Sequence, residues 1–312
     1  MKKTAIFTAI ISSCLSFSAI ADNVCLTNIN NQAFDNILDL GNCNLTDSDM
    51  PTVISYLNNH PNLTSVELGE NQLTDASAKL LATNTNIREL YLYQNKLGTE
   101  GAKTLASMKN LTSLTLDDNR IGDDGAIALT ANTNLDTLGL ENNNLTIQSM
   151  TALSSMPNLQ SVDVSFNSLG DAGISELIKN SHITVLYANH TGITHKGAAA
   201  LANDNSLFIL FIEQNQIGDV GAAAFSNAPL LILDINNNNI GDLGASALAS
   251  NKLMSSLYIS HNNIADAGAT TLATNTSLNF LDVSYNHIGS AGIAALQSNS
   301  SLQTVITEGN DG

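Results

Sequence analysis

Short stretches in which apolar and polar residues alternate recur along the whole chain. In LTSLTLDDNRI, residues 111–121, leucines stand at the first, fourth and sixth places and an isoleucine stands at the eleventh. An alternation of period two predicts a β-strand, with Leu114 and Leu116 on one face and Ser113 and Thr115 on the other. The pattern therefore predicts a short strand with one buried face and one face whose residues are not constrained by packing in the core.

The same eleven-residue pattern repeats at a nearly constant period. It recurs as IRELYLYQNKL (87–97), LQSVDVSFNSL (159–169), LFILFIEQNQI (207–217) and LNFLDVSYNHI (278–288). Its ninth place, which we call the ladder position, is held in turn by Cys43, Asn71, Asn95, Asn119, Asn143, Asn167, Thr191, Asn215, Asn238, Asn262, Asn286 and Asn310. Nine of the eleven steps between these residues are 24 residues long. Self-similarity at such a period predicts a solenoid of about 12 stacked repeats.

The second half of each unit predicts a turn and a short helix. In GDDGAIALTANT, residues 122–133, Gly122 permits the turn, and Asp123 is expected to be the N-cap of the helix. Ala126 and Leu129 would face the sheet. The asparagines at the ends of these helices are expected to adopt a left-handed conformation: Asn84, Asn132, Asn203, Asn251, Asn275 and Asn299.

The repeated L-x-x-L-x-L-x-x-N-x-L pattern resembles the leucine-rich repeat family, over roughly residues 34–312. The G-D-x-G-A turn and the helix after it are similar to the ribonuclease-inhibitor-like subclass, and the compact units resemble bacterial secreted members. The resemblance implies an α/β fold. It would be a curved horseshoe with a parallel β-sheet on the concave face, short helices on the convex face and about 12 repeats of 24 residues.

The N-terminus has the pattern of a secretory signal peptide. Lys2 and Lys3 precede an apolar stretch that ends at Ala19-Ile20-Ala21, an A-x-A cleavage site. We expect residues 1–21 to be this signal, residues 22–50 to be an N-terminal cap with the first repeat, and residues 51–312 to be the solenoid. A lipoprotein signal ending at Cys14 is the alternative. Either signal predicts export to the periplasm, the cell surface or the medium.

Two cysteines follow the predicted cleavage site, Cys25 and Cys43. In an exported protein such a pair predicts a disulfide, here one that would pin the cap to the first repeat. The alternative is that Cys43 is a buried thiol, because it occupies a ladder position.

Acidic residues dominate the charge of the chain. Without Lys2 and Lys3 there are 9 basic and 28 acidic residues, which gives a net charge of −19. Phosphate backbones and anionic membranes repel such a chain, so nucleic acid is excluded as a partner and no membrane insertion is expected. The charge favours a basic protein partner, although it would also serve solubility alone.

The sequence carries no pattern for a metal, a cofactor or a catalytic centre. DDNRIGDDG, residues 117–125, resembles a calcium loop, but Ile121 and Ala128 stand where that loop needs ligands. The six histidines have no ligand spacing, and there is no phosphate loop or nucleophile elbow. The repeats also occupy nearly all of the chain. We therefore predict no metal, no cofactor and no enzymatic activity.

From residue 63 to residue 310, the strand positions that point away from the core are the third, fifth, seventh and eighth of each unit. They hold eight aromatic residues: Tyr91, Tyr93, Phe166, Tyr187, Phe211, Tyr258, Phe280 and Tyr285. They also hold eleven acids: Glu67, Glu70, Glu89, Asp117, Asp118, Glu141, Asp163, Glu213, Asp234, Asp282 and Glu308. They hold no lysine or arginine. Exposed aromatics among charges of one sign are typical of a binding face, although aromatics also suit strands in general.

We therefore predict a monomeric, non-enzymatic interaction module that binds a basic protein partner through its concave face. The partner could be an enzyme that this protein inhibits, or a host surface protein. The predicted contact residues are Tyr91, Tyr93, Asp117, Glu141, Asp163, Phe166, Tyr187, Phe211, Glu213, Asp234, Tyr258, Asp282 and Tyr285. The alternative is a structural or adhesive protein of the cell envelope without a single high-affinity target.

Overall fold

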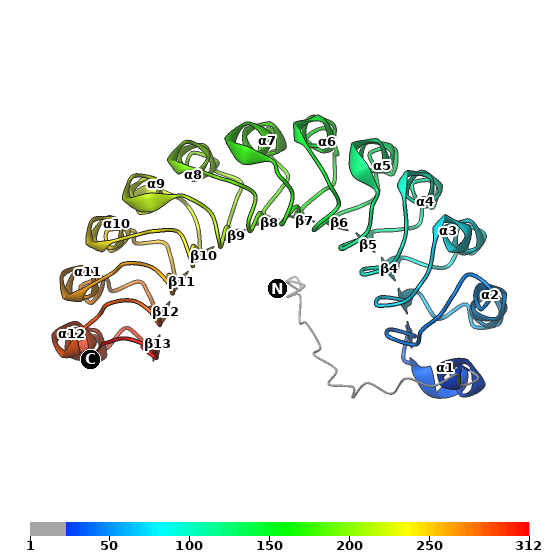
Figure 1. Cartoon of the computed structure of the whole chain (residues 1–312), viewed down its shortest axis with the longest axis horizontal. Coiled ribbons are helices and arrows are strands. Elements are labelled where there is room, and N and C mark those ends of the chain that lie inside the picture. The colour runs from blue at the N-terminus through cyan, green and yellow to red at the C-terminus, as the bar shows by residue number, and fades with distance from the viewer. Residues whose placement is uncertain (1–22, 312) are drawn as a thin grey trace.

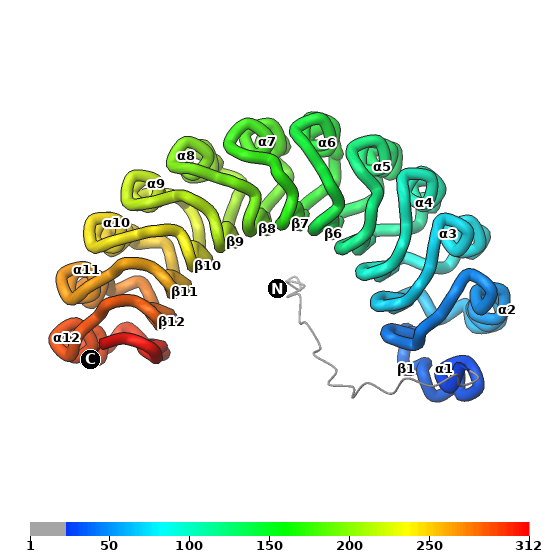
Figure 2. The backbone as a smooth tube through the Cα atoms, in the orientation of Figure 1, coloured from blue at the N-terminus to red at the C-terminus, as the bar shows by residue number. Residues whose placement is uncertain are grey.

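The backbone forms an arc of stacked turns with strands on the inner side and helices on the outer side (Figure 1). A computed structural model describes residues 23–311. The proposed signal peptide, residues 1–21 with Cys14, lies outside the described residues. Figure 2 shows each unit as one loop of chain laid against the next. The predicted horseshoe, with its inner sheet and outer helices, is confirmed.

Each strand from β2 onward is three residues long. The strands are β1 (Ala33–Phe34), β2 (Ile37–Asp39), β3 (Ser65–Glu67), β4 (Glu89–Tyr91), β5 (Ser113–Thr115), β6 (Thr137–Gly139), β7 (Ser161–Asp163), β8 (Val185–Tyr187), β9 (Ile209–Phe211), β10 (Ile232–Asp234), β11 (Ser256–Tyr258), β12 (Phe280–Asp282) and β13 (Thr304–Ile306). They form one sheet in chain order. From β2 to β13 every pairing is parallel, while β1 pairs antiparallel with β2.

The helices are short and follow the strands in alternation. They are α1 (Val24–Thr27), α2 (Met50–Asn59), α3 (Asp75–Leu81), α4 (Thr99–Leu105), α5 (Gly122–Leu129), α6 (Ile147–Leu153), α7 (Gly170–Leu177), α8 (His195–Ala202), α9 (Gly218–Ala224), α10 (Asp242–Leu248), α11 (Asp266–Leu272) and α12 (Ser290–Ser298). Two 3₁₀ turns, η1 (Ile29–Gln32) and η2 (Phe225–Asn227), complete the elements. In the described residues no helix has the length and apolar character that crossing a bilayer requires.

The core lies between the sheet and the helices. The middle residue of each strand is in register with that of the next, as Leu90 is with Leu114, and both are fully buried. Ala126 and Leu129 of α5 close the core from the outer side. The apolar residues of the strands and those of the helices thus form one continuous core layer.

A disulfide joins Cys25 of α1 to Cys43, as predicted. It ties the first helix to the turn after β2, and β1 pairs with the outer edge of β2. The alternative of a buried thiol at Cys43 is therefore wrong. Cys43 occupies a ladder position, but its sulfur is bonded to Cys25 at the N-terminal end of the solenoid.

The ladder asparagines satisfy backbone groups of two neighbouring units. The Nδ2 of Asn119 donates to the carbonyl oxygens of Leu116 and Asp117 in its own unit and of Leu92 in the preceding unit, at 2.9–3.1 Å. Its Oδ1 accepts from the backbone NH of Leu97 at 2.9 Å. A buried polar group needs such partners, and stacked units supply them at every step.

The unit at 183–193 keeps its place in the sheet although its ladder residue is Thr191. The Thr191 hydroxyl donates to the carbonyl oxygen of Ala188 at 2.9 Å. Because Thr191 has no amide oxygen to offer the preceding unit, the Leu169 NH donates instead to the carbonyl of Asn167 in its own turn. On the other side, Asn215 accepts from three successive NH groups, beginning with that of Thr191.

The helix-end asparagines are not left-handed, so that prediction is wrong. Positive φ occurs instead at the eighth position of the units, just before the ladder residue, from Asn42 (φ 53°) to Gly309 (φ 71°). The helix-end asparagines act through their side chains: Asn132 donates to the carbonyl of Met108 in the preceding unit and accepts from the NH of Asn134. The sharp turn is thus at the end of the strand, and not at the end of the helix.

Asp123 does not cap its own helix, so this prediction is also wrong. Its Oδ1 accepts from the NH of Thr146, the N-cap residue of α6 in the next unit, at 2.8 Å. Asp171 makes the same contact with Thr194, and Asp219 with Gly241. Successive helices lie side by side, so an aspartate in the first turn of one helix reaches the free NH groups at the start of the next.

Candidate binding face

The fifth positions of the units form one straight row across the concave face, which we call the central row. Parallel pairing without a register shift places each of these residues beside its equivalent on the next strand. From β2 to β13 the row consists of Asp39, Glu67, Tyr91, Thr115, Gly139, Asp163, Tyr187, Phe211, Asp234, Tyr258, Asp282 and Ile306. Seven of the predicted contact residues therefore lie in one line.

Aromatic rings of neighbouring units contact one another in two groups. In the first, Phe166 in the turn after β7 stacks on His190 in the turn after β8 (centroids 5.2 Å apart), and Tyr187 of β8 stacks on Phe211 of β9 (4.6 Å). In the second, Tyr258 of β11 packs against Phe280 of β12 (4.7 Å), and His261 and Tyr285 in the turns after these strands stack on each other (4.4 Å). We call them the first and the second aromatic group. Stacked rings stiffen one another, so each group is a pre-formed surface.

The histidines of these groups were missed in the sequence. His190 and His261 stand at the eighth position, the same position as Phe166 and Tyr285 one unit away. The signal was available, because residues 24 apart lie side by side in such a fold.

Phe166 and Tyr285 occupy backbone positions that bulky residues rarely adopt. Their φ angles are 54° and 52°, in the left-handed region, and their side chains are 45% and 46% exposed. Asparagine suits this conformation and stands there in Asn142 and Asn237. The backbone preference therefore does not explain a ring at such a place. Local rules are commonly broken at functional sites.

A third aromatic contact surface lies at β4, where Tyr91 and Tyr93 are half-buried. The Tyr93 ring lies over Gly69, where an added Cβ would stand only 2.3 Å from its Cζ atom. Burial and the nearby carboxylates of Glu67 and Glu70 raise the pKa of Tyr93 to about 12. Like an ordinary tyrosine, Tyr93 is protonated at physiological pH, and its hydroxyl can donate a hydrogen bond to a partner.

Asp117, Glu141 and Asp163 converge on neighbouring turns of β5–β7. The Oδ1 of Asp117 accepts from the Glu141 NH at 2.8 Å, and Gly139 provides the space, since a Cβ there would lie 2.8 Å from that oxygen. The pKa of Asp117 is raised to about 8, mostly by burial and then by the negative charges of Asp163 and Glu141. Burial also raises the pKa of Glu141 to about 7 and that of Asp163 to about 6.

The acids of the concave face have no basic partner within the described chain. Between residues 23 and 311 the ion pairs are Lys103–Glu100, Lys179–Glu176 and His287–Asp311, none of which includes a predicted contact acid. Burial raises the pKa of Asp234 and of Glu67 to about 7. The face therefore presents acidic groups that are partly desolvated, several of which hold their protons up to about neutral pH, and no basic residue of the described chain pairs with them.

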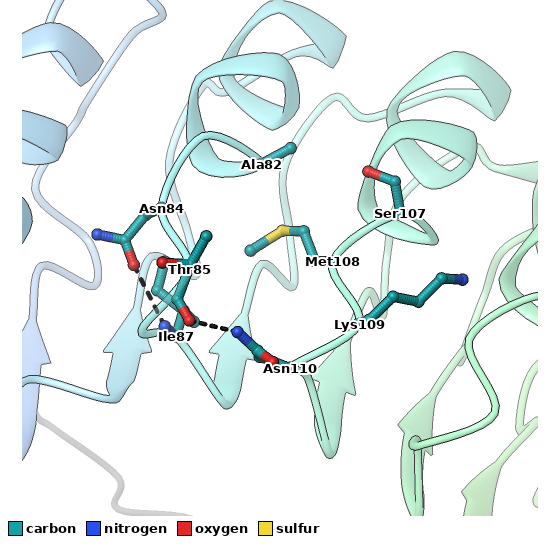
Figure 3. A pocket seen from close by; sticks show the side chains of 8 residues that line it. All are labelled: Ala82, Asn84, Thr85, Ile87, Ser107, Met108, Lys109 and Asn110. Atoms are coloured by element: carbon teal, nitrogen blue, oxygen red, sulfur yellow. Dashed lines mark hydrogen bonds between the residues drawn. The ribbon is translucent and has the colours of Figure 1, made fainter.

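A small hollow lies elsewhere, beside the loops that lead into β4 and β5 (Figure 3). Its lining includes Asn84, Thr85 and Asn110, and two of its polar side chains bond to backbone within it: Asn84 accepts from the Ile87 NH, and Asn110 donates to the Thr85 carbonyl. Because these groups satisfy one another, the hollow offers little to a ligand. Within residues 23–311, no three histidine, cysteine or acidic side chains are grouped so as to hold a metal ion.

The chain belongs to the leucine-rich repeat family. Its sequence matches the family "Leucine rich repeat" over residues 61–121, 109–169 and 229–288, more than half of the chain. No curated protein matches the sequence significantly.

Two internalins of Listeria monocytogenes are among the similar solved structures. The internalin InlF is 24% identical with a TM-score of 0.56, covering 81% of this chain and 76% of its own. The internalin C2 is 25% identical with a TM-score of 0.50, covering 65% of this chain and 83% of its own. Binding by the predicted contact residues stays a prediction, since similarity at this level shows the fold alone.

Proposed function

We propose that this protein is a non-enzymatic interaction module that binds a basic protein partner on its concave face. The observation that carries the proposal is the composition of that face: stacked aromatic rings among partly desolvated acids, without a lysine or an arginine. Aromatic anchors contribute on the order of 2 kcal/mol each at protein interfaces. A surface whose charged groups are all acidic accelerates the approach of a basic partner and favours it over acidic proteins.

The leucine-rich repeat fold supports this function through its shape. Twelve parallel strands, β2–β13, spaced ~4.8 Å apart give an inner face roughly 50 Å long. A standard interface needs about 800 Å² on each partner, which such a face can supply. We further propose that the protein acts as a monomer, and that its partner is an enzyme or a host surface protein that the concave face covers.

Export fits the same proposal. The Cys25–Cys43 disulfide is of the kind that persists in oxidising compartments, and we propose that residues 1–21 direct the chain to one of them. Residues 22–50 would then form the cap with the first repeat, and residues 51–312 the solenoid. Its G-D-x-G-A helix turns support the ribonuclease-inhibitor-like subclass, and bacterial effectors of this class are the nearest functional analogy.

An affinity capture with residues 22–312 as bait tests the proposal. The test variant carries Tyr91→Ala, Tyr187→Ala, Phe211→Ala and Tyr258→Ala. The matched control carries Ile127→Ala, Ile147→Ala, Val220→Ala and Leu243→Ala, because these apolar side chains are exposed on the helices. We expect a basic protein that the wild type and the control retain, that the test variant loses and that high salt releases.

A protein that the wild type and the test variant retain but the control loses would move the function to the convex helices. A protein that all three baits retain equally would mean that neither set of side chains holds it. If no single protein is enriched by any bait, the chain is instead a structural or adhesive protein of the cell envelope.

A further inference from the structure

Asp234 occupies a distinctive place in the central row, between the two aromatic groups. On β10 it is in register with Phe211 of β9 on one side and with Tyr258 of β11 on the other. Asp163 is flanked by Tyr187 and Gly139, and Asp282 by Tyr258 and Ile306. Among the described strands, Asp234 is therefore the acid in the row with an aromatic neighbour on both sides.

The unit of β10 places no aromatic side chain between Phe211 and Tyr258. The concave positions of this unit hold Ile232, Asp234, Asn236 and Asn237, none of which is aromatic. An aspartate carboxylate ends closer to the sheet than a phenyl or phenol ring does. A group that approaches Asp234 from solvent therefore passes between the ring of Phe211 and the ring of Tyr258.

The carboxylate of Asp234 has little inside the chain to stabilise its charge. One oxygen accepts from the Asn236 NH at 3.0 Å. The other charges that act on it are those of Glu213 and Asp282, which are also negative, and with burial they raise the pKa of Asp234 to about 7. Asn237 donates to Glu213 at 3.3 Å and so holds this second acid beside the site. A cation placed here would be attracted by three carboxylates at once.

The spacing of the walls selects a flat cation. Phe211 and Tyr258 are two strands apart, which is roughly 9.6 Å at a strand spacing of ~4.8 Å. Two aromatic faces at that separation leave room for one planar group between them. A guanidinium is planar and weakly hydrated, stacks on aromatic faces and binds a carboxylate with two parallel hydrogen bonds. An ammonium is more strongly hydrated and cannot make the bidentate contact.

We propose that Asp234, Phe211 and Tyr258 form an arginine-binding site, which takes one arginine side chain of the basic partner. The guanidinium pairs with Asp234 and lies between the rings of Phe211 and Tyr258, while Glu213 and Asp282 add long-range attraction. This inference rests on the proposed function, because it specifies which chemical group of the basic partner the concave face binds.

Two peptides of equal charge, hexa-arginine and hexa-lysine, test the inference. Their affinities for residues 22–312 are measured by fluorescence anisotropy at about 0.15 M salt, where attraction between distant charges is screened. We expect hexa-arginine to bind about 10-fold more tightly than hexa-lysine, as a desolvated cation–π and bidentate contact would give. Asp234→Asn should abolish this preference, and so should Phe211→Leu combined with Tyr258→Leu.

Asp124→Asn is the matched control. It removes the same charge from an exposed position on α5 and should leave the preference for arginine unchanged. Equal affinities for the two peptides, no binding of either, or an equal loss in Asp124→Asn would each overturn the arginine site. None of these results would affect the capture experiment with the four-alanine variant, so the two proposals fail separately.

Discussion

The rings of Tyr187 and Phe211 lie parallel on adjacent strands, with centroids 4.6 Å apart and planes inclined by 1°. The contact follows from the register of β8 with β9, which places residues 24 apart in sequence next to each other. We expect this stack to contribute about 0.5–1.5 kcal/mol to the free energy of unfolding beyond the area that it buries. A double-mutant cycle of Tyr187→Leu and Phe211→Leu, measured by urea denaturation, gives the coupling energy directly.

A coupling energy near zero would contradict this expectation and would mean that the two rings act independently. Tyr91 and Phe211 serve as the control pair, because four strands, β5–β8, lie between them and their substitutions should be additive.

The left-handed backbone at Phe166 leads to a second prediction. Phe166→Asn should be at least as stable as the wild type, and about 0.5–1 kcal/mol more stable than Phe166→Ala, because asparagine tolerates φ near 54° and alanine does not. Both variants remove the stack with His190, so the difference between them isolates the backbone. Thermal denaturation of the three proteins measures it. Binding of the partner should weaken in both, and an asparagine variant less stable than the alanine variant would refute the explanation.

Much of this structure could be predicted from the sequence because each unit repeats the same physical solution. The strand around Leu114, the core under Leu129 and the ladder at Asn119 each occur many times, so chance departures in one unit do not hide them. The errors arose where a residue acts outside its own unit. Asp123 was assigned to its own helix, whereas its carboxylate bonds to the start of the next helix.

The candidate site was predictable in position but not in energetics. Register alone places Asp163 and Tyr187 in one row, and the sequence gives that register. Burial of a carboxylate depends on neighbours that the sequence pattern does not weigh: the missing side chain of Gly139 determines how deeply Asp117 lies. The pairing of His261 with Tyr285 could have been found by comparing residues 24 apart.

Repairing the ladder at Thr191 should stabilise the protein. In Thr191→Asn the new amide could donate to the carbonyls of Val164 and Ala188, as Asn167 does to those of Leu140 and Val164. Its oxygen could accept from the Leu169 NH. We expect a gain of about 1 kcal/mol in the free energy of unfolding, measured by urea denaturation.

The reverse change in the neighbouring unit, Asn167→Thr, is the matched comparison and should cost about 2 kcal/mol, because it leaves buried backbone groups unpaired. A loss of stability in Thr191→Asn would mean that the degenerate unit has relaxed around threonine and no longer accepts the amide.

The raised pKa of Asp117 predicts that stability falls as the pH rises. In the folded protein this carboxyl holds its proton up to about pH 8, whereas its ordinary pKa is 3.8. Between these two values the folded state binds more protons than the unfolded state, so raising the pH favours unfolding. The carboxyls of Glu141 and Asp234, with pKa values of about 7, act in the same direction.

Asp117→Asn should therefore stabilise the protein by at least about 1 kcal/mol at pH 8 and have almost no effect near pH 3, where the carboxyl is mostly protonated in both states. The asparagine oxygen can still accept from the Glu141 NH, so the local structure is kept. The free energy of unfolding at both pH values measures the effect, with the exposed Asp124→Asn as the control. If Asp117→Asn stabilises equally at both pH values, the gain comes from packing and not from the charge of a buried carboxylate. A loss at pH 8 would instead show that the Asp117 charge is stabilised by a contact that outweighs its burial.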